Sequence, residues 1–458
     1  MPGQTHLIER QAENGNMMKL QKLLILCTFL FTSSSALAQV TLYDQNQWKV
    51  TMGGFIELDT IYDTTRSLTE VAGSSALAKK GTFDGDNGRT QFSIRNTRLS
   101  FGVTAPVVDD WKTRGYLETD FLGYDPTVAS SGTTNSEGSY YTSPTLRIRH
   151  AYLTGEKNGW QILAGQTWSL FGWQPNYVLA TVSVAPVTGT LYQRSERIGV
   201  MKTVSGDTQS LQVAASFQRP TQRDGRIPNF DLGVKWSDDS RKGGFSSANS
   251  DIKTQPLSLG LSGTYRNYTY PTTTTSIDDS TSMAALALAA NALIPIIASS
   301  DGKDVSHTLT AVGEFTVGQG YGDEFPSWSG GLAQLSTAAA APLNIDSGVG
   351  GYNSNGTFEL VKLRTWNTQL QYHFEGQTFM TAGYGQLWSS NMGDFAAGSG
   401  QTASKQYDRS EAKFVNLAHD FTPQMRVAFE FDQFTTHYSA DNSVNHDNRY
   451  MIATYFRF

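Results

Sequence analysis

The sequence is poor in cysteine, in proline and in charge. Its 458 residues include one cysteine, Cys27, and 14 prolines. A single cysteine excludes a disulfide framework and a zinc site built from cysteines. Charged residues make up 17% of the chain and the formal net charge is −6, whereas roughly 25% of an ordinary soluble chain is charged. Because no basic excess exists, a nucleic-acid partner is not expected.

Long hydrophobic runs are also lacking. The apolar run at residues 23–31 is too short to cross a bilayer as a helix, which takes about 20 residues. Lys19 and Lys22 precede this run, and small residues ending in Ala-Leu-Ala at 36–38 follow it. This order is typical of a secretory signal peptide with its cleavage site.

The chain is therefore predicted to divide into an N-terminal leader and signal peptide, residues 1–38, and an exported domain, residues 39–458. Translation starts either at Met1 or at the later pair Met17 and Met18.

Aromatic residues and glycine are abundant, with 24 Phe, 20 Tyr, 9 Trp and 43 Gly. They recur in short segments in which apolar and polar residues alternate. One segment places Thr113, Leu117 and Phe121 on one face, with Lys112 and Glu118 on the other. A period of two indicates a strand whose faces meet different surroundings. In a membrane barrel the apolar face meets lipid and the charged face lines the lumen.

The end of the chain favours a membrane barrel over a soluble sheet. Alternation over residues 448–458 places aromatic and aliphatic residues on one face and ends on Phe458. A terminal Phe is typical of the signal that the barrel-assembly machinery reads. Connections also alternate between short ones, such as 105–110, and long ones, such as 319–357. Short periplasmic turns and long external loops produce that rhythm.

We therefore predict an all-β protein, a closed antiparallel transmembrane β-barrel in the outer membrane of a Gram-negative bacterium. Fifteen alternating segments are clear in the sequence: 50–61, 91–104, 111–122, 145–155, 160–168, 190–203, 209–218, 228–237, 256–267, 306–317, 359–374, 377–388, 409–419, 424–436 and 448–458. An even number is expected for such a barrel. The missing strand is assigned to residues 282–295, whose Ala and Leu content also suits a loop helix. With it the barrel has sixteen strands, wide enough for an aqueous channel.

The predicted inner wall gathers arginines on three consecutive strands, which lie about 4.8 Å apart. The arginine guanidinium group stays protonated, and its planar, forked set of N–H donors matches the two oxygens of a carboxylate. One interpretation is a binding wall for anionic solutes; the other is pairing of these arginines with Glu118, Asp120, Glu57 and Asp59 on neighbouring strands. The candidate pore-lining, substrate-binding residues are Arg98, Lys112, Arg114, Tyr116, Glu118, Asp120, Arg147 and Arg149.

The segment Trp168–Gly189 follows the fifth strand and is the candidate constriction loop. It carries Trp168, Phe171, Trp173 and Tyr177 but no acidic or basic residue. The acids that would oppose the basic wall are thus expected to be missing.

No catalytic residue, metal site or cofactor is predicted, because no two histidines stand at metal-ligand spacing. His150 and Tyr152 have the outward parity of their strand and hint at a subunit contact.

Several sequence pieces spread over the exported domain carry a family resemblance. They are GGFIELD (53–59), RNTRLSFG (95–102), RIRHAYL (147–153), LAGQTWSLFG (163–172), NLAHDFTPQMRVAFEFD (416–432) and ATYFRF (453–458). Together they resemble the DcaP-like group of sixteen-stranded, trimeric outer-membrane porins. The resemblance implies passive diffusion of small hydrophilic solutes with a preference for organic anions such as dicarboxylates. It also implies a homotrimer and a third external loop that folds into the barrel.

Two other function classes stay open beside the porin: an outer-membrane barrel enzyme, and a surface adhesin or structural barrel. A soluble secreted β-sandwich is a less favoured alternative to the barrel fold. No Ser-His or Asp-His grouping stands out, so the chain is not expected to be an enzyme. The expected partners are small anionic solutes, outer-membrane lipid, the barrel-assembly machinery and further copies of the chain.

Overall fold

A computed structural model describes residues 39–458, apart from 124–144, 179–180, 184, 274–275, 334–343, 376 and 396–402. The predicted leader and signal peptide, residues 1–38, lie outside the described residues, as does most of the connection 123–144.

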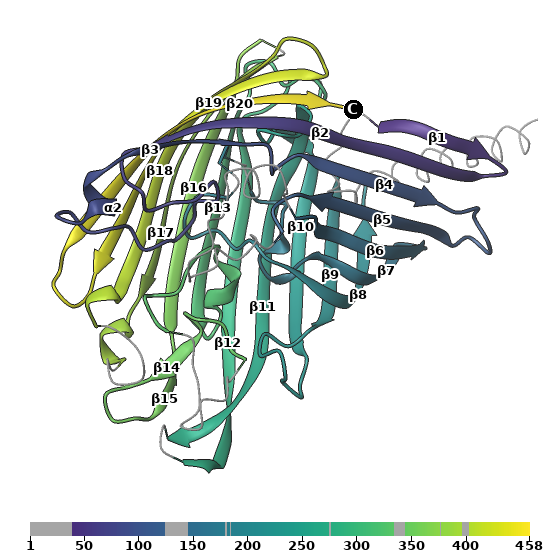
Figure 1. Cartoon of the computed structure of the whole chain (residues 1–458). Helices are drawn as coiled ribbons and strands as arrows, with labels where there is room; N and C mark the ends of the chain where they lie inside the picture. Colours follow the sequence, from purple (N-terminus) through teal and green to yellow (C-terminus); the bar gives the residue numbers. More distant parts are fainter. Residues whose placement is uncertain are drawn as a thin grey trace, which may run out of the picture. The chain divides into compact units, whose positions relative to one another are not determined.

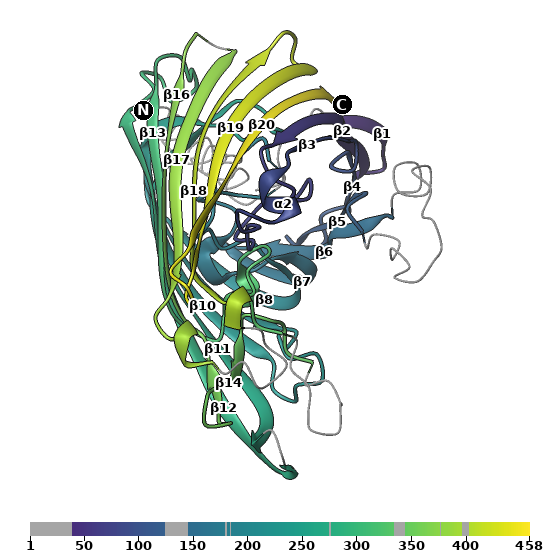
Figure 2. The ribbon, with the colours of Figure 1, turned by 60° about the vertical axis from the view of Figure 1, so that its left-hand side comes forward.

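Sixteen antiparallel strands form a closed barrel (Figures 1 and 2). Each strand pairs with the next along the chain, and the pairing of the first strand with the last closes the ring. The strands are β2 (Trp48–Asp63), β4 (Arg98–Thr104), β5 (Lys112–Asp120), β6 (Arg147–Lys157), β7 (Trp160–Trp168), β8 (Arg194–Ser205), β9 (Gln209–Gln218), β10 (Asn229–Phe245), β11 (Lys253–Thr273), β12 (Ser276–Ile297), β13 (Leu309–Gln319), β16 (Lys362–His373), β17 (Thr378–Ser389), β18 (Tyr407–Asp420), β19 (Met425–Tyr438) and β20 (Val444–Arg457).

The remaining elements are short. Four are strands: β1 (Gln39–Gln45), β3 (Arg89–Ser93), β14 (Gly350–Tyr352) and β15 (Phe358–Leu360). Five are single helical turns: α2 (Phe83–Asp86), η1 (Phe171–Trp173), η2 (Gly322–Glu324), η3 (Met392–Asp394) and η4 (Ala403–Lys405). Within the described part of the chain, no helix combines the length and the apolar character that a membrane crossing demands.

The predicted all-β class and the closed sixteen-stranded barrel are confirmed. Residues 282–295 lie in β12, which pairs with β11 up to Leu293 and with β13 from Ala287 onward, so the alternative of a loop helix was wrong. The alternation explains why. Ala285 and Ala287 are buried on the inner face, whereas Leu286 and Leu288 are 61% and 64% exposed on the outer face. Two partner strands thus override the helix propensity of an Ala-rich segment.

The outer surface of the barrel is apolar and its inner surface is polar. Exposed residues include Ile198, Phe217, Leu261 and Phe429, each on the face opposite the lumen. Buried positions of the same strands carry Asp231, Arg266 and many serine, threonine and glutamine residues. In lipid such an outer face is stable, and the closed ring leaves no unpaired strand edge.

Two features near the seam of the barrel, where β2 pairs with β20, differ from the predicted strands. Segment 91–104 is not one strand, because residues 94–97 interrupt it; β3 pairs with the second half of β2, and β4 with the first. β1 was not predicted, and it pairs with the first half of β2. The terminal Phe458 continues the line of β20 and exchanges two backbone hydrogen bonds with Gly54, at 2.9 and 3.1 Å.

Candidate functional site in the barrel lumen

The predicted basic wall forms on β4, β5 and β6, but part of it is neutralised. Arg149 donates to Glu118 at 2.7 Å and to Asp120 at 3.1 Å. Arg147 donates to the same Asp120 at 2.6 Å. These two arginines therefore pair with acids on β5, as the second interpretation of the wall expects.

Other arginines on this wall form no ion pair with a described carboxylate, although Arg98 lies within electrostatic range of Glu118 and Asp120. Arg98 lies over the ring of Phe55, 5.1 Å from its centroid, and donates only to the Asn96 amide oxygen. Arg194 lies 4.7 Å from the Trp168 ring and close to Arg98 and Arg149. The four arginines of this wall and of β8 that form no ion pair with a described residue are Arg98, Arg114, Arg194 and Arg197.

Arg194 and Arg197 were absent from the predicted site. Both stand near the start of β8, where the sequence shows no clean alternation. Of the predicted residues, Tyr116 donates to Glu118 at 2.9 Å and so belongs to the wall. Lys112, the first residue of β5, is exposed and lies outside the arginine group.

Tyr192 joins the arginine group from the loop that precedes β8. Its ring lies 4.6 Å from that of Trp168 and 5.7 Å from the Arg194 guanidinium. Burial alone would raise the pKa of Tyr192, but the positive charges of Arg149, Arg194 and Arg98 lower it to about 8. The direction indicates a local excess of positive charge.

The outward placement expected for His150 and Tyr152 was wrong. The register between β5 and β6 shifts next to Glu118, which opposes His150, whereas Thr119 opposes Ile148. A one-residue bulge exchanges the two faces of the strand beyond it. His150 is consequently 6% exposed and hydrogen-bonded to Thr167, and Tyr152 lies against Tyr116. Neither side chain supports a subunit contact.

The third external loop, residues 169–193, contacts inner-wall side chains on several strands. Trp173 and Tyr177 pack where the wall has glycine. A Cβ atom built at Gly233 would lie 2.9 Å from the Trp173 ring, and one at Gly260 would lie 3.1 Å from the Tyr177 hydroxyl. The Trp173 indole also donates to the Leu261 carbonyl at 3.1 Å. Phe171, Trp173 and Tyr177 are thus buried anchors of the loop, and they offer little surface to a passing solute.

Buried carboxylates of the wall bind the backbone of the same loop. Glu430 on β19 accepts hydrogen bonds from the amides of Val182, at 2.6 Å, and Ser183, at 2.8 Å. Glu314 on β13 accepts one from the Leu191 amide at 2.8 Å. The loop therefore reaches from β7 and β8 to β19 on another side of the ring.

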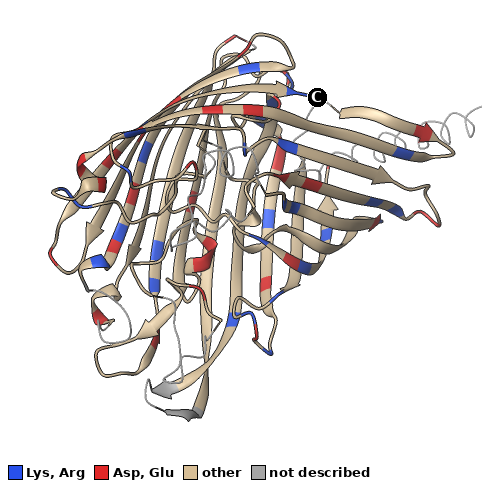
Figure 3. Ribbon diagram, in the orientation of Figure 1, with Lys and Arg blue, Asp and Glu red and all other residues tan. Residues whose placement is uncertain are grey.

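Acidic residues are missing from the third loop, but they do occur on the barrel wall, beside the seam. Glu57 and Asp59 on β2, with Glu430 and Asp432 on β19, form an acidic sector on either side of β20. Figure 3 shows charged residues along the strands as well as at their ends. The lumen thus has an acidic sector next to a basic one.

Two further external loops fold inward, and no local pattern in the sequence predicted either of them. In the first, residues 64–88, Glu70 binds Arg95 at 2.6 Å, and the carbonyls of Thr69 and Glu70 accept from Arg449. Leu68, Ala72 and Leu77 of this loop are buried against Phe434 and the third loop.

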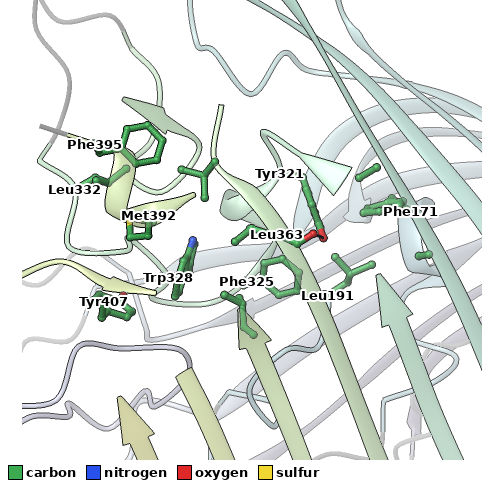
Figure 4. Packing of buried hydrophobic residues seen from close by; sticks show 14 of the residues in the cluster. Phe171, Leu191, Tyr321, Phe325, Trp328, Leu332, Leu363, Met392, Phe395 and Tyr407 are labelled. Atoms are coloured by element: carbon green, nitrogen blue, oxygen red, sulfur yellow. Dashed lines mark hydrogen bonds between the residues drawn. The ribbon is translucent and has the colours of Figure 1, made fainter. Parts of the chain in front are cut away.

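The sixth external loop, residues 320–361, packs onto the third. Figure 4 shows Phe171 and Leu191 near Tyr321 and Phe325, with Trp328 beyond. Asp323 and Glu324 both bind the buried Arg266 of β11. Burial raises the pKa of Glu324 to about 8, although Arg266 opposes that shift.

The loop contacts leave one part of the inner wall less covered. The third loop is anchored on β10, β11, β13 and β19. Between residues 171 and 191 its described hydrogen bonds include none to β4, β5 or β6, the strands that carry the predicted arginines, whereas Tyr192 at the end of the loop lies beside Arg149 of β6.

Comparison with solved structures finds a whole-barrel match. The outer-membrane channel DcaP of Acinetobacter baumannii superposes with a TM-score of 0.57 over 90% of this chain and 97% of that one, at 17% sequence identity. The fold is that of a DcaP-like outer-membrane porin. OmpF of Salmonella typhi, in complex with daunomycin, matches with a TM-score of 0.47 at 11% identity, covering 92% of this chain and 100% of that one. OprB of Pseudomonas putida matches with a TM-score of 0.46 at 10% identity, covering 88% and 94%.

At these identities the likeness to the DcaP-like porin concerns the fold. Neither a protein-family model nor a curated protein matches the chain. The resemblance read from the sequence is confirmed at that level, and an outer-membrane location agrees with both the porin fold and the apolar outer surface.

Proposed function

We propose that the protein is an outer-membrane porin through which small hydrophilic solutes diffuse passively, with a preference for organic anions such as dicarboxylates. The observation that carries the proposal is the group of arginines on β4, β5 and β8 that form no ion pair with a described residue. The middle of the third loop is anchored away from them, on β13 and β19.

Electrostatics gives the arginine group its effect on permeation. Guanidinium groups stay charged at any physiological pH. At an effective dielectric constant near 20, two unit charges 4 Å apart interact by roughly 4 kcal/mol. Salt and water in the lumen reduce this value. A dicarboxylate gains from two arginines at once, for example Arg98 and Arg194, whereas a cation is repelled by both.

The acidic sector competes with this preference, but it is partly offset by Arg449 of β20, which stands opposite Asp432 of β19. Glu430 accepts the two amides of the third loop. Asp63 on β2 binds Arg449 at 2.7 Å. Selectivity depends on the charge at the narrowest section rather than on the net charge of the chain. The proposal therefore places the anion path along the basic sector.

The proposal includes a homotrimer in outer-membrane lipid, by analogy with the porin group that the sequence resembles. Reconstitution of the purified protein in planar bilayers tests the central function. Stepwise ionic current is expected; a protein that inserts but conducts no current would instead favour an adhesin, a structural barrel or a barrel enzyme.

A further inference from the structure

The connection between β10 and β11 folds into the barrel from the end that holds the C-terminus. β10 and β11 pair regularly up to Asp238 and Leu257, and again from Lys242 and Pro256 to Phe245 and Lys253. Residues 239–241 are extra on β10 and have no partner on β11. Such a bulge bends a strand pair, and it redirects the hairpin tip, residues 246–252, toward the lumen.

Two glycines let the hairpin pass close to neighbouring strands. A Cβ atom at Gly243 would lie 2.3 Å from the Thr310 hydroxyl of β13, and one at Gly244 would lie 2.2 Å from Nδ1 of His373 on β16. No other residue fits at these positions without movement of the wall. Arg241, at the base of the hairpin, donates a hydrogen bond to the carbonyl of Pro295 at 2.8 Å.

The tip contacts inward-facing side chains on strands β16, β18 and β19, which are not its own strands. Its Ser246 amide donates to Gln371 of β16 at 2.8 Å, and the Gln371 amide returns a bond to the Ser246 carbonyl at 2.7 Å. Ala248 packs in one buried cluster with Ala418 of β18 and Ala428 of β19. The small alanines on the wall make room for the tip.

Two buried arginines hold the tip by its carbonyl groups. Nη1 of Arg426 on β19 donates to the carbonyls of Ser247, Ala248 and Ser250, at 2.9, 2.9 and 2.8 Å. Arg457 of β20 donates to the Ser250 carbonyl at 3.1 Å. Asp420 of β18 accepts from both arginines and fixes their orientation. The tip therefore spans from β10 and β11 to β19 and β20.

We infer that the hairpin tip is a second constricting element of the channel, which enters the lumen from the end opposite to the third external loop. The two meet on the wall of β18 and β19, since Val182 of the third loop packs in the same buried cluster as Ala248 of the tip. This inference rests on the proposed channel function. A solute that has passed the arginine group must then pass between the tip and the strands with which the tip has no described contact, such as β4, β5 and β6. The tip thereby sets part of the conductance and of the size limit.

Shortening the hairpin tests the inference. Replacing residues 246–252 by Asn-Gly joins the paired residues Phe245 and Lys253 through a two-residue turn that suits a hairpin. We expect a higher single-channel conductance and passage of larger solutes. The control is Asp109→Asn with Asp110→Gly in the exposed β4–β5 turn, which changes a turn at the same end of the barrel without touching the lumen.

Chemical modification gives a second test in a chain with an intact hairpin. The exported domain, residues 39–458, contains no cysteine, so Asn249→Cys places a single thiol on the half-buried tip. Reaction with an anionic methanethiosulfonate is expected to reduce the current, whereas the same reagent on Asp110→Cys leaves it unchanged.

The outcomes separate this inference from the proposed function. If the wild type carries no current, the channel function fails. If the wild type conducts but the shortened hairpin has the wild-type conductance, or modification of Asn249→Cys leaves the current unchanged, the second constriction is refuted and the channel function stands.

Discussion

Replacement of Glu430 by Ala removes the acceptor that holds the third external loop on β19. Two buried amides, those of Val182 and Ser183, then have no carboxylate to bind. An unsatisfied buried amide costs about 1–3 kcal/mol, so the anchored position of the loop loses about 2–6 kcal/mol. Since about 1.4 kcal/mol corresponds to a tenfold change in an equilibrium, the loop should leave this position at least about ten times more often.

Single-channel recording measures that change. Glu430→Ala should show larger current fluctuations and visits to a higher conductance, because the loop intermittently clears the lumen. Glu430→Gln keeps one acceptor oxygen and should give a smaller effect. Glu196→Ala is the matched control, since this carboxylate is 57% exposed and pairs only with Arg219 outside the lumen. A folded Glu430→Ala channel with wild-type conductance and wild-type noise would refute the anchoring role.

Three other changes have defined expectations. The pKa of Tyr192 is lowered to about 8, so raising the pH from 7 to 9 should create a phenolate beside the arginines and weaken the anion preference. Tyr192→Phe should abolish this pH dependence. An equal pH dependence in Tyr192→Phe would contradict the role of Tyr192. Gly233→Leu should collide with the Trp173 ring and cost about 1–3 kcal/mol, seen as a lower melting temperature, whereas Gly206→Ala in the exposed β8–β9 turn should have little effect. Mass measurement in mild detergent should give three copies of the chain, and a monomer that crosslinking in membranes also reports would exclude the homotrimer.

The strands were predictable because each carries its own local pattern. Segment 209–218 matches β9 at both ends, and 160–168 matches β7. Alternation fixes which residues share a face, and turn residues fix where a strand stops. β12 was recoverable for the same reason, despite its helix-favouring composition.

Irregularities of register were not predictable from alternation alone. The bulge next to Arg149 and His150 changes the face of every later residue in β6, and the break at 94–97 turns Arg95 toward Glu70. Each depends on a neighbouring strand rather than on the local sequence. The parity of Arg194 was ambiguous for a similar reason, because β8 begins directly after the third loop.

The contents of the lumen depend on contacts between residues distant in the chain. Glu430 meets Ser183, and Arg426 meets Ser250, across 247 and 176 residues respectively. Nothing in the local sequence around Ser183 or Ser250 indicates which distant residue it will contact. One signal was present, however: Gly243 and Gly244 interrupt the strand pattern of β10, and adjacent glycines in a strand mark a bend or a close approach.

The reversal potential across a salt gradient tests the central claim most directly. The wild-type channel should prefer anions, and the preference should be larger for a dicarboxylate salt than for chloride. Arg98→Ala combined with Arg194→Ala should reduce it, whereas Arg219→Ala, on an exposed ion pair, should leave it unchanged. A cation preference in the wild type, or an unchanged anion preference in the double variant, would contradict the account.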